Sequence, residues 1–343
     1  MIDRKVEKEN SSLELSGRKM DIETTAAYFE SRQYLYEKLV NEVEYILTEK
    51  IKETGIKPAS ISSRVKLLES FREKISRKKY RNPMDQMHDL AGVRVVCAYQ
   101  SELDTIAEII ESNFEVLERT DKAEELGVNK MGYSGRAFVV KLGSRYSGGR
   151  YEDLTSLRCE IQYRTILQDA WAIIDHQLVY KDEASVPEGM RRDINNVASL
   201  LEVAQGVFDR VKESRSEYIE EIKDMAKNAS AFLRLPLNFD TVLEYARRSY
   251  PDIEPSEKLT RLLLDDLSME KYPTLRELDC VVGQAKEAVE VYQQENPDWF
   301  KNSTDFLTKS LGFIDPDFRQ NHAFAPRTRE AFEKYQHLLP SHD

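Results

Sequence analysis

Acidic, amide and basic side chains alternate with apolar ones in the stretch Cys159–Arg164, CEIQYR, and this spacing predicts a short strand. Successive side chains of a strand point to opposite faces, so Glu160, Gln162 and Arg164 should share one face. A predicted helix follows at once, and open α/β sheets bind ligands where a strand end meets a helix start. The sequence therefore predicts a ligand site here, with an ordinary charged surface strand as the alternative.

A cationic stretch, residues 63–81, stands out in a chain whose formal net charge is -11. Its sequence, SRVKLLESFREKISRKKYR, has eight Lys or Arg and two Glu. Treated as a helix, at about 100° per residue, it places cations and a hydroxyl on one face and apolar residues on the other. That face predicts a polyphosphate site, with a solvated basic surface as the alternative. It consists of Lys66, Ser70, Lys74 and Arg77, with Arg64 at its margin.

Asp89 precedes a predicted apolar strand, Val93–Tyr99, from which Arg94 points outward. Mg²⁺ on a nucleotide is typically held by an Asp beside a strand start and a Glu on a second strand, because this cation prefers a few carboxylates plus phosphate oxygens. Asp89 and Glu160 match this pattern. The pair His88-Asp89 suggests a metal phosphohydrolase instead. That alternative lacks ligands, because the chain has five histidines and none precedes His88.

Tyr133 follows Gly132 at the end of a long polar loop. In that position a tyrosine can stack on a base while Lys122, Lys130 and Arg136 contact phosphates. A tyrosine that packs on the rim of the sheet fits the local sequence equally well.

Composition narrows the function classes. Charged residues make up 32% of the 343 residues and no apolar run approaches the length of a bilayer span, so we expect no membrane segment. The N-terminus lacks the apolar core of a signal peptide, which predicts a cytoplasmic protein. The three cysteines have no CxxC spacing and are interpreted as buried thiols in a reducing compartment. The acidic balance argues against general nucleic-acid binding, so an anionic ligand must meet a local basic patch.

The elements that position these residues follow from hydrophobic periodicity. Residues 22–54 are a predicted packing helix that Gly55 and Pro58 end, and Ser62 or Ser63 can cap the next helix. A helix at 101–112 and strands at 114–119 and 137–142 follow. The helix after Arg164 is expected to pack inward through Ile166, Leu167, Ala170, Trp171, Ile174 and Leu178.

The second half of the chain is predicted to be helical, first at 183–228 and then in short segments that prolines separate. These segments are 238–249, 256–268, 274–294, 299–311 and 327–338. Without clustered Cys or His and without a dense basic stripe, this module is interpreted as a regulatory or protein-contact domain. The predicted domains are residues 1–59, 60–228 and 229–343.

Four motifs occur in one order: Arg64-x-Lys66-x3-Ser70-x3-Lys74, then His88-Asp89-Leu90-Ala91-Gly92-Val93-Arg94, then Gly132-Tyr133, then Glu160-Ile161-Gln162-Tyr163-Arg164. This arrangement resembles the synthetase domain of the RelA/SpoT alarmone synthetases, especially the small single-domain members, over roughly residues 60 to 215. The resemblance implies an α/β fold with a nucleotidyltransferase-like mixed sheet flanked by helices, followed here by the helical module.

The resemblance also implies a GTP diphosphokinase that transfers the β,γ-pyrophosphate of ATP to the 3′-hydroxyl of GTP or GDP and makes (p)ppGpp. Asp89 and Glu160 would hold Mg²⁺, and Glu160 would also accept the proton of the attacking hydroxyl. Positioning and charge neutralisation dominate such transfers. The implied ATP-binding residues are Arg64, Lys66, Ser70, Lys74, Arg77 and Arg94, and the implied acceptor-binding residues are Tyr133, Lys122, Lys130, Arg136, Gln162, Arg164 and Asp169.

The acceptor loop departs from the family pattern Gly-Tyr-x-Ser-x-His, because this chain reads Gly132-Tyr133-Ser134-Gly135-Arg136-Ala137. The alternatives are therefore a toxic synthetase that pyrophosphorylates adenosine nucleotides or the tRNA 3′ end, or a catalytically weakened nucleotide-binding regulator. Residues 1–60 are too few for the hydrolase domain of the long members. Residues 229–343 would restrain the synthetase or bind a protein partner, and a homo-oligomer is a further expectation.

Overall fold

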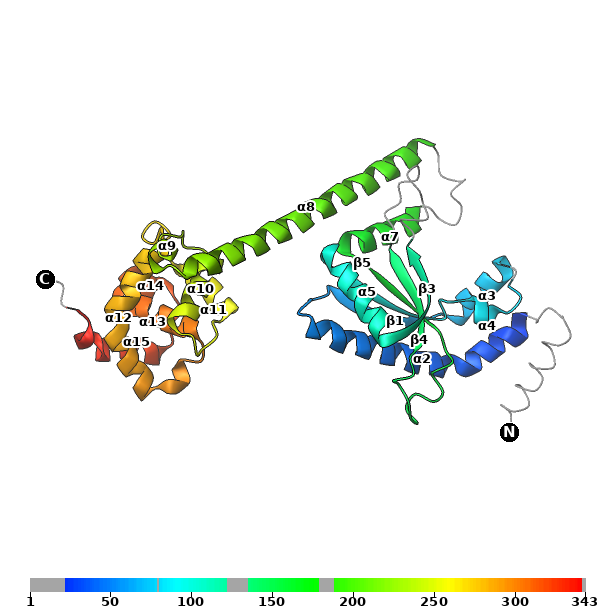
Figure 1. Ribbon diagram of the computed structural model, residues 1–343, viewed down its shortest axis with the longest axis horizontal. Coiled ribbons are helices and arrows are strands. Elements are labelled where there is room, and N and C mark those ends of the chain that lie inside the picture. The colour runs from blue at the N-terminus through cyan, green and yellow to red at the C-terminus, as the bar shows by residue number, and fades with distance from the viewer. Residues whose placement is uncertain (1–21, 79, 122–134, 179–187, 341–343) are drawn as a thin grey trace. The chain divides into compact units, whose positions relative to one another are not determined.

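The chain forms two compact units in a computed structural model that describes residues 22–78, 80–121, 135–178 and 188–340 (Figure 1). The first unit extends to Val211 and the second begins at Lys212, so the division falls inside the long helix α8 (Glu188–Ala226). The predicted boundary after residue 228 lies just beyond the end of this helix. The N-terminal helix predicted as a separate segment contributes to the core of the first unit.

The first unit contains a five-stranded mixed sheet of order β1-β2-β5-β4-β3. Neighbouring strands are antiparallel except for β2 and β5, which are parallel. The strands are β1 (Ser60–Val65), β2 (Ala91–Cys97), β3 (Phe114–Asp121), β4 (Arg136–Leu142) and β5 (Cys159–Thr165). The prediction of an α/β fold with a mixed sheet flanked by helices is confirmed.

One face of this sheet is apolar and packs against helices. The alternation predicted for β5 is confirmed, since Cys159, Ile161 and Tyr163 are buried in the same core as residues of α2 and α5. This core holds the sheet rigid, so the side chains of its opposite face are fixed relative to one another. Besides the first part of α8, the described helices of the first unit are α2 (Ile22–Glu53), α3 (Leu68–Arg77), α4 (Pro83–Gln86), α5 (Ser101–Asn113) and α7 (Ile166–Leu178).

The prediction of one helix over residues 63–81 is wrong in its first part. Residues 60–65 form β1, and the helix α3 begins at Leu68, so Ser62 and Ser63 lie in a strand and cap no helix. Two features favour the strand. Ile61 and Val65, which are partly buried, alternate with exposed residues. In addition, β1 pairs with the outer edge of β2, whose backbone groups would otherwise be unpaired.

The helix after β5 is confirmed, but its predicted inward face is wrong in part. Trp171 is buried, whereas Ala170 is exposed and Ile166 and Ile174 are each 46% exposed. The start of α7 explains its rotation: Gln168 Oε1 accepts the Thr165 backbone N–H at 2.9 Å, and Thr165 Oγ1 accepts the Gln168 N–H at 3.2 Å. This reciprocal cap matches the pattern Thr-x-x-Gln and turns Gln168 inward.

The second unit is helical, as predicted. Its two apolar cores contain residues of the last part of α8 and of the helices that follow. These elements are α9 (Ala229–Phe232), α10 (Phe239–Ser249), α11 (Glu257–Asp266), α12 (Leu275–Glu295), η2 (Pro297–Trp299), α13 (Ser303–Ile314), α14 (Pro316–Asn321), α15 (Pro326–Lys334) and η3 (Gln336–Leu338).

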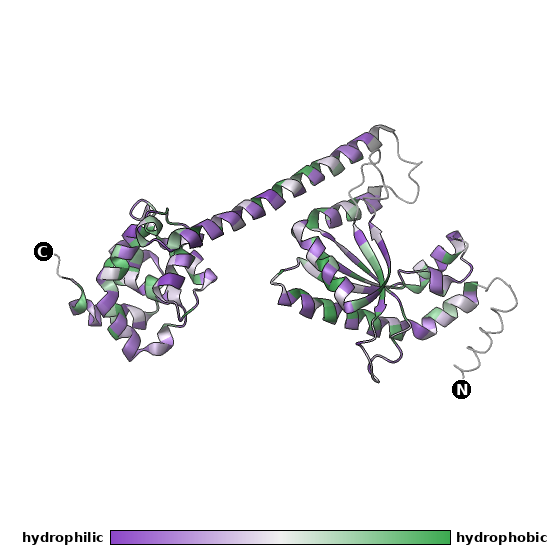
Figure 2. Cartoon of the chain, in the orientation of Figure 1, coloured by the Kyte–Doolittle hydropathy of each residue, from purple (hydrophilic) through white to green (hydrophobic). Residues whose placement is uncertain are grey.

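Polar and apolar residues alternate along α8 (Figure 2). Several of its apolar side chains are exposed, among them Leu200 at 68% and Val203 at 64%. Within the described residues, no helix combines the length and the apolar character that a membrane crossing needs.

Candidate functional site

The strand register brings five of the predicted site residues to one face of the sheet, opposite the apolar core. Arg64 lies opposite Gly92, which lies opposite Glu160. Two residues further along β2 and β5, Arg94 lies opposite Gln162. Residues that face each other on paired strands, and residues two apart on one strand, share a face. Arg64, Arg94, Glu160, Gln162 and Arg164 therefore share what we call the polar face.

Two lysines converge on Asp89 at the start of β2. Lys66 Nζ donates a hydrogen bond to Asp89 Oδ2 at 2.7 Å, and Lys74 Nζ lies 2.8 Å from Asp89 Oδ1. Lys66 follows β1 and Lys74 lies on α3, so a strand end and a helix hold the same carboxylate. The three side chains are only 13–22% exposed. Two cations and one anion leave a net positive charge, which favours an incoming polyanion.

The pKa of Asp89 reflects this environment. Burial alone would raise the pKa of the Asp89 carboxyl, but the hydrogen bonds and positive charges of Lys66 and Lys74 outweigh burial and hold it below its usual value of 3.8. Asp89 is therefore an anion at neutral pH and is able to hold a cation.

A chain of polar contacts links α7 to Glu160 across the polar face. Arg94 and Arg164 both approach Asp169 Oδ1 of α7, at 3.2 and 3.6 Å. They also donate to Gln162 Oε1, at 3.4 Å from Arg94 and 2.7 Å from Arg164. Because these donors occupy its carbonyl oxygen, the Gln162 amide turns its nitrogen to Glu160 and donates to Oε2 at 3.0 Å. Glu160 is thus oriented by residues of β2, β5 and α7.

Among the residues that make these polar contacts, Arg164 is the most buried, with 9% of its surface exposed. Desolvation lowers the pKa of its guanidinium, and the nearby charge of Arg94 acts in the same direction, opposed by Asp169 and Glu160. Gly135 lies against it, since a Cβ atom added to this glycine would be 3.3 Å from Arg164 Nε. This burial suits a residue that orients Gln162 more than one that contacts an acceptor directly.

The structure does not bring Arg136 together with these residues. Arg136 lies opposite Tyr163, a core residue, and therefore on the other face of the sheet. Its guanidinium contacts Asp104 at 2.9 Å and Asp121 at 3.0 Å. Burial opposes the charge of Arg136, but these two carboxylates raise its pKa.

The remaining predicted residues divide into two groups. Ser70 and Arg77 lie on α3 at helical spacing from Lys74, on the same side of the helix, and both are exposed. Tyr133, Lys122 and Lys130 lie outside the described residues.

Two features of the site escaped the sequence analysis. His88 Nδ1 lies 3.1 Å from Glu118 Oε2, and Glu118 pairs with Val139, the residue that also pairs with Glu160. The segment that holds Asp89 is thereby tied to β3 on the polar face. This contact joins residues distant in sequence, so local sequence contains no signal for it. The cap formed by Thr165 and Gln168 did have a signal, the Thr-x-x-Gln pattern.

The polar face fits a Mg²⁺ ion that arrives with a nucleotide. Among the described residues, no three His, Cys, Asp or Glu side chains lie together as a ready metal cage. Mg²⁺ is usually bound through one or two carboxylates plus substrate phosphates. The half-buried, anionic Asp89 precedes β2, and Glu160 lies on β5, the strand that pairs with β2, so two carboxylates come from neighbouring strands. When the nucleotide binds, its phosphates would replace Asp89 as the partners of Lys66 and Lys74.

Comparisons with known proteins bear on the same region. A family model described as a region found in RelA and SpoT proteins matches residues 63–185. The chain is 28% identical to GTP pyrophosphokinase YjbM of Bacillus subtilis over 167 residues. The aligned region covers 48% of this chain and 73% of that protein. The chain is also 26% identical to GTP pyrophosphokinase YwaC of the same organism over 144 residues. This aligned region covers 40% of this chain and 66% of that protein, which is slightly under two thirds of its length.

Among solved structures, the crystal structure of the small alarmone synthetase 1 from Bacillus subtilis matches with a TM-score of 0.47 and 22% identity, over 55% of this chain and 98% of that chain. The family match ends at residue 185, so the second unit lies outside it.

Proposed function

We propose that this chain, whose residues 63–185 form a RelA/SpoT-type domain, is a pyrophosphokinase that transfers the β,γ-pyrophosphate of ATP to the 3′-hydroxyl of GTP or GDP. Its main support in the structure is the convergence of Lys66 and Lys74 on Asp89. This cluster adjoins β2, which pairs directly with the strand that bears Glu160. A cationic site for phosphates thus lies beside an oriented carboxylate.

On the donor side, Lys66 and Lys74 would bind the ATP phosphates, and Ser70 and Arg77 would extend that site along α3. Arg64 and Arg94 lie on neighbouring strands of the polar face, one diagonal step apart, and would hold adenine between them. Mg²⁺ bound by Asp89 and Glu160 would neutralise charge on the phosphates. The lysines already stand at the carboxylate that the metal needs, so nucleotide, metal and cations would meet at one place.

On the acceptor side, Glu160 would accept the proton of the attacking 3′-hydroxyl. One of its oxygens, Oε2, already accepts a hydrogen bond from Gln162, which fixes the carboxylate in one orientation. Gln162 and Asp169 would face the acceptor, with Arg164 behind them as a positioning residue. Tyr133 as a base-stacking residue and Lys122 and Lys130 as phosphate contacts complete the proposal.

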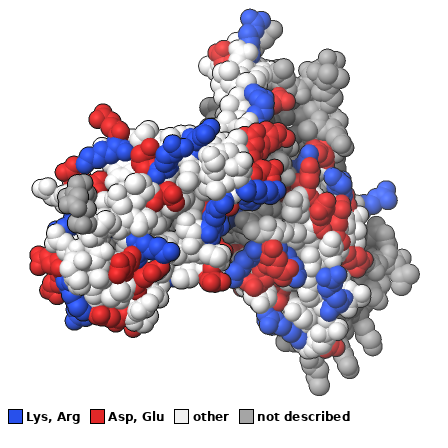
Figure 3. Space-filling view, turned by 60° about the vertical axis from the view of Figure 1, so that its left-hand side comes forward, with Lys and Arg blue, Asp and Glu red and all other residues white. Residues whose placement is uncertain are grey.

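A different acceptor is the second candidate, favoured by two observations. Arg136 is held by Asp104 and Asp121 on the opposite face, and Ala137 stands beside Gln162 where the family has a histidine. An adenosine nucleotide or the tRNA 3′ end would then replace GTP. A tRNA acceptor requires a basic surface and binding that weakens steeply with salt. On the face drawn in Figure 3, the described Lys and Arg are interspersed with Asp and Glu.

The test incubates the purified full chain with Mg²⁺ and γ-labelled ATP, and with GDP, GTP, ATP or bulk tRNA in separate reactions. We expect AMP release together with label on GTP or GDP. A new labelled product in which ATP carries an added 3′-pyrophosphate, or label on tRNA, would support the second candidate. Nucleotide binding without AMP release would instead identify a catalytically weakened regulator and contradict both.

We also propose that residues 229–343 restrain the synthetase or bind a protein partner. A chain that ends at residue 228 keeps α8 whole and removes the helices that follow. Restraint predicts faster AMP release from the shorter chain than from the full chain, assayed side by side at equal concentration. Equal rates of AMP release from the two chains would contradict the proposed restraint.

A further inference from the structure

Arg136 ties three elements together on the apolar side of the sheet. Its guanidinium lies 2.9 Å from Asp104 Oδ1 of α5 and 3.0 Å from Asp121 Oδ2 of β3, while Arg136 itself begins β4. In the strand register, Asp121 is its partner on β3 and Tyr163 its partner on β5, and these are the end pairs of β4 with its two neighbours. Strand ends open more easily than strand centres. The ion pairs therefore hold the first residue of β4 where the sheet is weakest.

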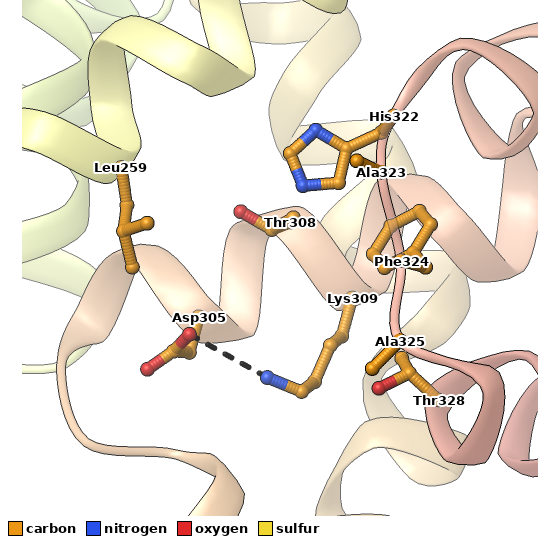
Figure 4. A pocket seen from close by; sticks show the side chains of 9 residues that line it. All are labelled: Leu259, Asp305, Thr308, Lys309, His322, Ala323, Phe324, Ala325 and Thr328. Carbon is orange, nitrogen blue, oxygen red and sulfur yellow. Dashed lines mark ion pairs between the residues drawn. The ribbon is translucent and has the colours of Figure 1, made fainter.

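The two ion pairs of Arg136 differ in strength. The side chain of Asp121 is 13% exposed, whereas that of Asp104 is 79% exposed. Water and salt screen an exposed pair, so the contact with Asp121 carries most of the hold on Arg136. This contact joins two strands. By contrast, the ion pair beside a small cavity of the second unit joins Lys309 to Asp305 of the same helix, α13 (Figure 4).

The backbone of Gly135, the residue before Arg136, packs against the polar face. Gly135 lies one position beyond the pair of Arg136 with Tyr163, which places it next to Arg164 of β5. A Cβ atom added to Gly135 would be 3.3 Å from Arg164 Nε and 3.6 Å from Arg164 Cζ. Neighbouring residues of a strand face opposite sides of the sheet. A contact that holds Arg136 on the apolar side therefore also holds Gly135 against Arg164 on the polar side.

Arg164 depends on this packing, because few polar contacts fix its guanidinium. Its Nε is buried and makes no hydrogen bond to any of the described residues. One terminal nitrogen donates to Gln162 Oε1 at 2.7 Å, and the other stays 3.6 Å from Asp169 Oδ1, beyond good hydrogen-bond distance. If Gly135 moved away, the guanidinium would gain room to leave Gln162. The Gln162 amide would then lose the donor that turns its nitrogen toward Glu160.

We infer that Arg136, held on the apolar side of the sheet, is a positioning residue for the proposed base Glu160 on the opposite side. Its ion pairs keep Gly135 against Arg164, and Arg164 in turn keeps the Gln162 amide turned toward that base. This role rests on the proposed function, in which Glu160 accepts the proton of the attacking hydroxyl. A shift of about 1 Å at a reacting group can lower a rate about 10²-fold, so a distant contact that prevents the shift affects the reaction.

The kinetic test measures AMP release by the full chain with ATP, Mg²⁺ and the acceptor that takes the label. Arg136→Met should lower kcat about 10-fold or more and change KM for the acceptor less than about twofold. Arg136→Lys, which keeps the charge, should restore part of the rate. Asp121→Asn should lower kcat more than Asp104→Asn, because the Asp121 carboxylate is the enclosed one. A higher KM for the acceptor with an unchanged kcat would make Arg136 an acceptor contact and overturn the inference.

A double-mutant cycle decides whether Arg136 acts through Arg164. If it does, Arg136→Met should add less than about twofold to the loss in kcat that Arg164→Met already causes. Losses that multiply, as those of two independent structural defects do, would contradict this route. The rates are compared at a temperature where every variant is folded, as urea unfolding followed by Trp171 fluorescence in a Trp299→Phe background reports.

A second readout needs no activity and so separates this role from the proposed function. Phenylglyoxal modifies accessible arginines, and peptide mass spectrometry reports each site. Without nucleotide or metal, Arg164 should be modified about 10-fold faster in Arg136→Met than in the unchanged chain. Arg150→Met, which removes an exposed arginine paired with Glu42 of α2, should leave Arg164 protected. Equal protection of Arg164 in Arg136→Met overturns the positioning role, whereas a chain that releases no AMP but shows this change contradicts only the proposed function.

Discussion

The two units use polar contacts differently: those of the first unit join distant residues around one face of the sheet, whereas the second unit combines local helix caps with distant pairs between helices. In the first unit, Lys66 contacts Asp89 across 23 positions and Arg94 contacts Asp169 across 75. In the second unit, capping boxes join residues three apart, as in Thr274 with Glu277 and Asn302 with Asp305. Local pairs define where helices begin, whereas distant pairs assemble a surface from several elements. The distant pairs of the first unit gather around one face of the sheet, whereas those of the second unit, such as His322 with Asp266, tie helices to one another.

The largest expected difference comes from one substitution made in both units. Glu160→Gln removes the proposed base and should lower the rate of AMP release by about 10²–10⁴-fold. Glu277→Gln keeps an acceptor for the Thr274 backbone N–H and should leave the rate within about twofold, since glutamine also completes a capping box. The measurement is the initial rate of AMP release at saturating ATP. Similar rates for the two variants would mean that Glu160 is not the base.

Removal of one lysine of the donor cluster should have the next largest effect. Lys66→Met deletes a charge-assisted hydrogen bond, and we expect KM for ATP to rise about 10–100-fold with a smaller change in kcat. The matched control is Lys50→Met, because Lys50 pairs with Glu53 on the surface of α2 and is 41% exposed. An unchanged KM in Lys66→Met would separate this cluster from ATP binding.

Two glycines of the second unit test tertiary packing against local propensity. A Cβ atom added to Gly312 would overlap the Phe332 ring and lie 2.8 Å from Phe324 Cζ, whereas one added to Gly283 would meet no atom within 4 Å beyond the backbone of its own helix. Gly312→Ala should lower the free energy of unfolding by about 1–3 kcal/mol. Gly283→Ala, inside α12, should raise it by up to about 1 kcal/mol. Urea unfolding followed by Trp299 fluorescence in a Trp171→Phe background measures both, and a neutral Gly312→Ala would contradict tight packing.

A helix cap should contribute less. Thr274 Oγ1 accepts the Arg276 backbone N–H at 3.3 Å and begins α12. Thr274→Ala should therefore lower the free energy of unfolding of the second unit by about 1 kcal/mol, and Thr274→Ser should preserve it. Neither change should alter AMP release. A loss of activity in Thr274→Ala at a temperature where the chain stays folded would contradict this separation between the units.

The smallest expected effect is the acid sensitivity of the first unit. Because Lys66 and Lys74 hold the pKa of Asp89 below 3.8, its contribution to stability is present above that value and is lost as the pH falls through the lower folded pKa. Urea midpoints reported by Trp171 in a Trp299→Phe background should therefore fall below pH 4. The decline should be shallower in Asp89→Asn. An identical decline in both chains would assign the acid sensitivity to other groups.

Sequence reasoning succeeded where structure depends on neighbours along the chain. The alternation that separates Glu160 from Ile161 held, because a strand has no other way to place successive side chains. It failed at residues 63–65, where helical spacing of cations suggested a helix, but backbone pairing with β2 produced a strand. It also failed for the inward face of α7, which the cap at Thr165 and Gln168 and the contacts of Asp169 rotate.

By itself, the sequence determined the residue types of the site, the approximate elements and the family resemblance, because these depend on order and spacing along the chain. Tertiary structure alone decided which residues meet. The register of β4 against β5 places Arg136 with Tyr163 on the apolar side, and the register of β2 against β5 joins Arg94 to Gln162. A shift of one residue in a strand would exchange its faces, and no local pattern fixes register across strands that distant segments form.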